Sequence, residues 1–99
     1  MTKVTIHLAT SHVMREVFFD SDSVKLVRDN FHEYKNAGTF ETLFEGEDAA
    51  EEAFDLTNNP SRQNEREKVY GRGRSVSSGD VIDVDGVKFV CMSVGWKQL

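Results

Sequence analysis

The segment VIDVDGVKFVC, residues 81–91, contains two apolar-rich runs joined by Asp85-Gly86. Asp-Gly is the preferred chemistry of a two-residue hairpin turn, because both central residues take a positive φ. The turn fixes the register, and a shift by one residue would turn the apolar face toward water. The predicted pairs are Val84 with Val87, Asp83 with Lys88, Ile82 with Phe89, Val81 with Val90, and Asp80 with Cys91. The predicted apolar face consists of Ile82, Val84, Val87, Phe89 and Cys91.

Two further strands are predicted near the N-terminus. Residues 3–9 (KVTIHLA) alternate apolar and polar side chains, which is typical of a half-buried strand. Residues 13–19 (VMREVFF) form a second β-type run, so the two segments are expected to pair as a hairpin. The alternative for residues 13–19 is an extended lead into the first helix.

The middle of the chain contains two predicted helices. Residues 20–38 form the first, which is expected to end at Gly38 because glycine accepts the left-handed conformation of a helix C-terminus. Its apolar stripe consists of Val24, Val27, Phe31 and Tyr34. Residues 39–46 return to a strand, and residues 47–60 form a second helix that begins with carboxylates and stops at Pro60.

Residues 61–74 have no hydrophobic period, so they are predicted to be a solvated loop or a short exposed helix, 62–69, before a Gly-rich turn. The resulting element order is ββαβαββ. This order indicates an α+β fold, with an antiparallel sheet of about five strands and two helices packed on one face. Trp96 is expected to cover one end of the core, and its indole N–H then needs an acceptor.

The chain has 99 residues, which is enough for one domain with a single core. No apolar stretch approaches the roughly 18 residues that span a bilayer, and no secretory signal is recognised at the N-terminus. Cys91 is the single cysteine, so an internal disulfide is excluded and a reducing, cytoplasmic setting is expected.

Charge divides this single domain, residues 1–99, into three parts: an acidic half (1–57), a basic connector (58–74) and the C-terminal hairpin region (75–99). Residues 16–55 hold twelve acidic side chains against three basic ones, whereas residues 56–74 hold five basic against two acidic. Such a distribution favours a partner with a basic surface over broad contact with nucleic acid.

Two groups of residues are candidate binding sites. The first is an acidic helix face, whose alternative is a solvated surface that keeps the protein soluble. It consists of Glu47, Asp48, Glu51, Glu52 and Asp55. The second is a set of cations in the connector that could follow nucleic-acid phosphates, although Tyr70 is the sole aromatic residue there for base stacking. It consists of Arg62, Arg66, Lys68, Arg72 and Arg74.

No catalytic residue, metal site or cofactor is predicted. His7, His12 and His32 are dispersed and lack the close spacing of metal ligands. Cys91 points to the apolar face of the predicted hairpin, which favours a buried structural thiol over a nucleophile.

From about residue 48 onward the chain reads AEEAFDLTNNP, then an arginine-bearing connector, then GRGRSVSSGDVIDVDGVKFVCMSVGWKQL. The pattern RS-x-S-x-GD-V-x-x-V-DG, ending in GW, resembles the YodL-like domain and short phage proteins that share it. The resemblance implies a phage or mobile-element setting and supplies no catalytic residue. Its recurrent positions suit a structural role through local side-chain bonds and a special φ at the glycine. They are Arg74, Ser75, Ser77, Gly79 and Asp80.

Together these features predict a small non-enzymatic phage or mobile-element protein that binds a host macromolecule through its acidic face. The expected partner is a host protein with a basic surface, met in the host cytoplasm. The alternative is a nucleic-acid-associated module that uses residues 62–74. No contact with a membrane is expected, and the protein is predicted to be a monomer or a homodimer.

Overall fold

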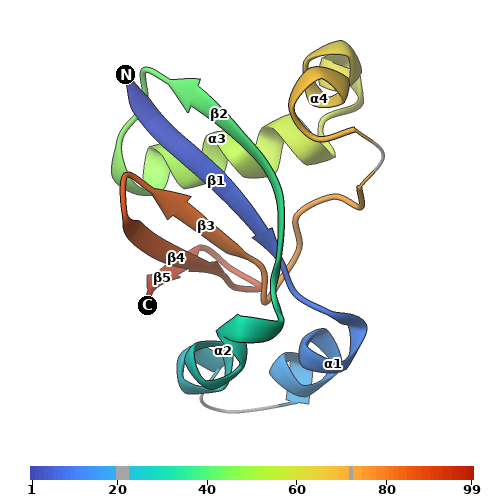
Figure 1. Ribbon diagram of the computed structural model, residues 1–99, viewed down its shortest axis with the longest axis vertical. Helices are drawn as coiled ribbons and strands as arrows, with labels where there is room; N and C mark the ends of the chain where they lie inside the picture. Colours follow the sequence, from blue (N-terminus) through green and yellow to red (C-terminus); the bar gives the residue numbers. More distant parts are fainter. Residues whose placement is uncertain (20–22, 72) are drawn as a thin grey trace.

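The computed structural model describes residues 1–19, 23–71 and 73–99, which form a five-stranded antiparallel sheet flanked by helices (Figure 1). The strand order in the sheet is β2-β1-β3-β4-β5. The strands are β1 (Thr2–Leu8), β2 (Lys35–Thr42), β3 (Val81–Val84), β4 (Val87–Cys91) and β5 (Trp96–Gln98). The helices are α1 (Ser11–Phe19), α2 (Ser23–Asn30), α3 (Gly46–Asn58) and α4 (Gln63–Val69), with 3-10 turns η1 (Phe31–Glu33) and η2 (Pro60–Arg62). The predicted α+β class and five-stranded antiparallel sheet are confirmed. The predicted order ββαβαββ with two helices is wrong, because residues 13–19 are helical, the connector contains α4, and the fifth strand is β5.

The C-terminal hairpin has the predicted register. Val84 lies opposite Val87, and the ladder continues to Val81 opposite Val90. Asp85 and Gly86 both take positive φ, of 49° and 92°. Beyond the ladder, Asp80 and Cys91 are joined as predicted, since the Cys91 N–H donates to the Asp80 carbonyl oxygen at 2.9 Å. Turn chemistry therefore determines this part of the fold locally.

The predicted N-terminal hairpin is wrong, because residues 13–19 belong to α1 and β1 pairs with β2 and β3 instead. Val13 and Val17 fit a strand face, but their spacing of four residues also places them on one side of a helix. Both are buried, whereas Arg15 between them is exposed, which is the helical pattern. The Thr10 hydroxyl accepts a hydrogen bond from the Val13 N–H at 3.4 Å, at the start of this helix.

The helix predicted over residues 20–38 is too long. α2 stops at Asn30, and after η1 the chain enters β2 at Lys35, so the strand predicted over residues 39–46 lies at 35–42 instead. Pairing with β1 satisfies the backbone groups of these residues, and it outweighs the local helical pattern. Gly38 lies within β2 rather than at a helix end.

Two apolar clusters lie on opposite faces of the sheet, because neighbouring residues of one strand point to opposite sides. Ile82 packs with Ala49 and Ala53 of α3, which runs behind the sheet in Figure 1. Val81 packs instead with Val13 of α1 and Val27 of α2. Helices thus cover both faces rather than the one face predicted.

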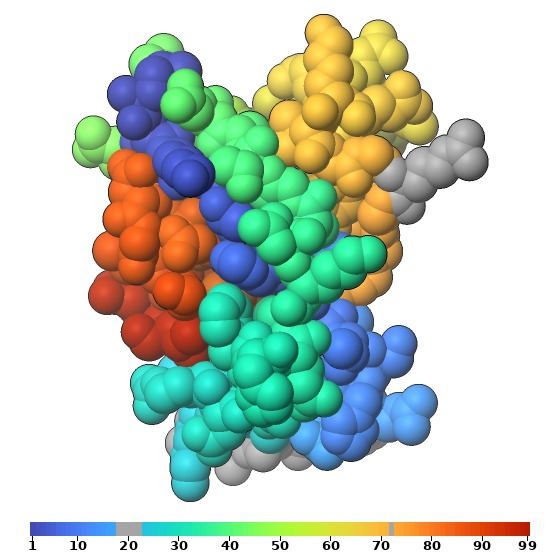
Figure 2. Space-filling model, viewed as in Figure 1, coloured from blue at the N-terminus to red at the C-terminus, as the bar shows by residue number. Residues whose placement is uncertain are grey.

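α1 and α2 lie side by side at the lower end of the sheet, and α4 lies beside β2 at its upper end (Figure 2). The short helix that was one of two alternatives for residues 62–69 is present as α4. Its approach to β2 depends on Gly38, because a Cβ atom there would lie 2.5 Å from the Val69 carbonyl oxygen.

Replacing Gly38 with alanine is expected to displace α4 and to lower the free energy of unfolding by about 1–3 kcal/mol, the usual cost of overpacking. Urea denaturation measures this loss. Lys35→Ala is the control, since Lys35 is an exposed residue of the same strand. Equal stability of the two variants would show that α4 does not depend on this close approach.

Candidate functional site

The RS-x-S-x-GD motif is built around an ion pair between Arg74 and Asp80. The Asp80 side chain is fully buried, and that of Arg74 is 36% exposed. The guanidinium bonds both carboxylate oxygens, with Nη1 at 2.6 Å from Oδ2 and Nη2 at 2.7 Å from Oδ1. The backbone N–H groups of Ala9 and Ser77 also donate to this carboxylate, each at 2.8 Å. The buried charge is therefore paired and hydrogen-bonded, as burial requires.

This ion pair joins segments that are far apart in the sequence. Arg74 Nη2 also donates to the Ala9 carbonyl oxygen at 2.9 Å, just beyond the end of β1. Gly79 has a φ of 94° and donates its N–H to the Cys91 carbonyl oxygen at 2.7 Å. Its own carbonyl oxygen accepts the Tyr34 hydroxyl at 2.5 Å, and burial raises the pKa of that hydroxyl. These contacts give the motif a structural role.

A second network ties the connector to the C-terminal end of α3. The Thr57 carbonyl oxygen accepts from Arg66 Nη1 at 2.6 Å and from the Ser75 hydroxyl at 2.7 Å. The Thr57 hydroxyl in turn accepts the Val76 N–H at 3.1 Å. The Tyr70 hydroxyl donates to the backbone of the same connector, and burial raises the pKa of Tyr70 to about 12. The connector is therefore packed against α3.

The cations predicted to contact nucleic acid are dispersed among these networks. Arg66 and Arg74 donate to protein acceptors as described above. Arg62 bonds three carboxylates, those of Glu52, of Asp55 at 2.9 Å and of Glu65 at 2.8 Å. These hydrogen bonds, that to Glu65 first, raise the pKa of Arg62. Lys68 is exposed on α4, and Arg72 lies outside the described residues.

Four of the five carboxylates of the predicted acidic face lie along one side of α3, and Glu47 lies apart from them. The four are Asp48, Glu51, Glu52 and Asp55. Glu47 and Asp48 are exposed in the first turn of the helix, and Glu51 accepts the Trp96 indole N–H at 2.8 Å. Glu52 and Asp55 share Arg62. Arg62 thus compensates the negative charge in the C-terminal half of α3, whereas within the part of the chain that the structure describes no cation pairs with Glu47 or Asp48.

A groove of about 390 Å³ runs along this side of α3, lined by Phe44, Asp48, Glu51, Glu52 and Asp55. Phe44 is 51% exposed, and its neighbour Leu43 is 86% exposed. Sequence reasoning missed both residues because it placed them inside a strand that ends at Thr42. The sequence did contain a sign of this apolar rim, because Leu43 and Phe44 are adjacent apolar residues just before an acidic helix.

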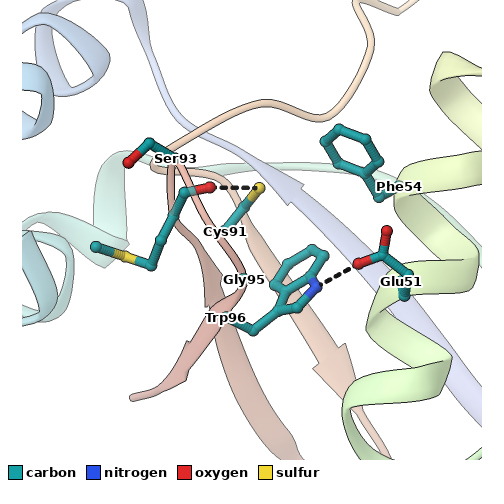
Figure 3. Close-up of a pocket in the computed structure, with 7 residues that line it drawn as sticks. Glu51, Phe54, Cys91, Ser93, Gly95 and Trp96 are labelled. Carbon is teal, nitrogen blue, oxygen red and sulfur yellow. Dashed lines mark hydrogen bonds between the residues drawn. The ribbon is translucent and has the colours of Figure 1, made fainter.

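A smaller cavity, of about 110 Å³, lies between α3 and the β4–β5 turn (Figure 3). Phe54 and Glu51 project into it from α3, and Trp96 closes it from β5. Cys91 lies at its inner side, and burial raises the pKa of this thiol to about 11. As predicted, Trp96 packs against the apolar core and its indole N–H has an acceptor, Glu51.

The three histidines lie at separate places. His7 packs against the ring of Phe31 with 5.1 Å between centroids, and burial lowers its pKa. His12 lies 3.1 Å from Glu16 on the exposed side of α1, and His32 belongs to η1. Within residues 1–19, 23–71 and 73–99, no three His, Cys, Asp or Glu side chains are grouped to hold a metal ion. Nor does any described helix have the length and apolar character to cross a membrane.

Searches against protein-family models, curated proteins and solved structures give no match for this chain. The resemblance of the C-terminal half to the YodL-like domain therefore stays a prediction.

The raised pKa of Cys91 leads to a pH-dependent test. With a shift from 9.0 to about 11, the thiolate fraction at pH 8 is about 100-fold lower in the folded protein than in the unfolded chain. Iodoacetamide should therefore alkylate the native thiol at least about 100-fold more slowly than the denatured one. The native rate should keep rising beyond pH 9, where the rate of the denatured chain levels off.

The same shift makes the free energy of unfolding depend on pH. The folded state favours the neutral thiol, so the contribution of Cys91 to stability is complete below pH 9. It is lost as the pH rises toward about 11. Fast native alkylation at pH 7 would contradict the buried, neutral state of Cys91.

Proposed function

We propose that this protein is a small non-enzymatic binding protein that holds a host protein with a basic surface against the outward side of α3. The observation that carries the proposal is the groove in which a half-exposed phenylalanine, Phe44, lies among four carboxylates. Protein-binding surfaces commonly have apolar anchor residues within a polar, solvent-accessible rim. The phage or mobile-element setting rests on the motif resemblance.

The distribution of charge along the groove favours partner binding at the end near Asp48. Arg62 compensates Glu52 and Asp55, whereas Asp48 is exposed, lines the groove and pairs with no cation among the described residues. Cationic side chains of a partner are therefore expected near Asp48 and Glu51, with an apolar side chain against Phe44. Such contacts steer association at low salt and are screened at high salt.

The state of the connector makes direct binding to nucleic acid the weaker proposal. Following phosphates requires exposed cations, but the guanidinium groups of Arg62, Arg66 and Arg74 already bond acceptors of the protein. The state of Cys91 supports a non-enzymatic role in the same way. A nucleophile needs a depressed pKa, and burial shifts this thiol in the opposite direction.

A charge-reversal experiment tests the proposal. The tagged protein captures its partner from a bacterial lysate treated with nuclease, and the purified partner is then titrated at about 0.1 M and about 0.5 M salt. Asp48→Lys, inside the groove, should weaken binding at least about tenfold at low salt, and Phe44→Ala should weaken it at both salt concentrations. Glu47→Lys is the matched control, because Glu47 is exposed on the same turn but outside the groove lining.

Partner binding that is equal for wild type, Asp48→Lys and Phe44→Ala would overturn the proposal. A partner that is captured only from an untreated lysate, and is lost after nuclease treatment, would overturn it and favour nucleic-acid binding by residues 62–74.

A further inference from the structure

We infer that the cavity beneath Trp96 is a binding site for an alkylammonium group, presented by a lysine side chain of the partner. This inference rests on the proposed function, because it identifies the anchor of the same surface. The cavity holds about 110 Å³ between α3 and the β4–β5 turn, so it suits one small head group rather than a whole metabolite.

The lining has the chemistry that a cation requires. Phe54 and Trp96 contribute aromatic rings, and Glu51 contributes a carboxylate between them (Figure 3). A cation within about 6 Å of an aromatic face is attracted by its quadrupole, and the attraction grows as water is removed. An anion would meet the Glu51 charge instead, so the cavity discriminates by sign.

The positions of these groups are fixed by contacts within the protein. The Trp96 indole N–H donates to Glu51 Oε2 at 2.8 Å, which fixes the ring and the carboxylate beside each other in the cavity lining. Trp96 lies opposite Cys91 in the β4–β5 ladder, and Phe54 packs against the main apolar cluster. Such support limits the conformational entropy that a ligand would have to overcome.

Glu51 also connects this cavity to the groove, because it lines both. A partner segment with an apolar residue near Phe44 can therefore extend a lysine over Glu51 and into the cavity. The carboxylates of Asp48 and Glu51 lie on its path. Continuity with the groove is the reason for choosing a lysine side chain over a free amine.

The experiment uses a probe that reproduces the lysine side chain. The whole protein is titrated with n-butylammonium chloride, and with n-butanol as the neutral analogue of the same length, at constant ionic strength. The indole signal of Trp96, the single tryptophan, reports occupancy by fluorescence and by NMR. Butylammonium should shift this signal saturably in the millimolar range, and butanol should not.

Glu51→Gln removes the charge but keeps an acceptor for the indole, and it should weaken butylammonium binding about fivefold or more. Phe54→Leu keeps an apolar side chain but removes the ring face, and it should weaken binding about threefold. Glu47→Gln makes the same charge change outside the cavity and should bind as the wild type does.

Three results would each overturn the inference. These are no saturable shift below about 50 mM probe, equal binding of butanol, and equal weakening by Glu51→Gln and Glu47→Gln. None of them touches the proposed function, which is decided separately by partner binding to Asp48→Lys. If the inference holds, a partner segment whose lysine is replaced by norleucine should also bind more weakly. Unchanged binding of that segment would indicate that the cavity takes a free amine, and it would overturn the assignment to a lysine side chain.

Discussion

The rest of the structure depends on the ion pair between Arg74 and Asp80. Its carboxylate is fully buried, and its guanidinium reaches the Ala9 carbonyl oxygen at the end of β1. The same aspartate follows a glycine in a left-handed conformation and passes directly into β3. The pair therefore joins the connector, the end of β1 and the start of the C-terminal hairpin at one point.

This arrangement explains why a chain with a basic connector presents an acidic surface. Arg62, Arg66 and Arg74 are engaged by the protein's own carboxylates and carbonyl groups. The exposed charge that remains near the start of α3 is negative, and it adjoins the apolar rim formed by Leu43 and Phe44. The functional proposals follow from this division between cations used for folding and carboxylates left at the surface.

Those parts of the fold that depend on local chemistry could be predicted from the sequence. The Asp85-Gly86 turn set the hairpin register, and the carboxylates and Pro60 marked the helix now seen as α3. The segment at residues 13–19 was mispredicted because Val13 and Val17 satisfy both a strand and a helix. Gly38 was mispredicted as a helix end because glycine is required there by a distant contact. A Cβ atom would collide with the Val69 carbonyl oxygen, which the local sequence does not reveal.

The candidate site was predictable in part for the same reason. Asp48, Glu51, Glu52 and Asp55 were found from helical spacing, since that spacing is a local property, and Glu47 was added from the acidic run that begins the helix. The partners of the arginines could not be found in this way, because Arg74 bonds a residue 65 positions away and Arg62 reaches across to another helix. Phe44 and the cavity under Trp96 likewise depend on where β2 ends and how β5 returns to α3.

A double-mutant cycle on Arg74 and Asp80 tests the central claim most directly. The free energy of unfolding is measured by urea denaturation for Asp80→Asn, Arg74→Met and the double variant, with Asp83→Asn as control. Asp83 pairs with Lys88 at 3.4 Å near the surface, so its loss should cost less than about 1 kcal/mol. Asp80→Asn should cost about 3 kcal/mol, near the lower end for buried pairs because Arg74 is partly exposed. The double variant should lose about 2 kcal/mol less than the sum of the single variants, because the second substitution removes a partner that the first has already left unpaired. Additive losses, with Asp80→Asn no worse than Asp83→Asn, would contradict the central claim.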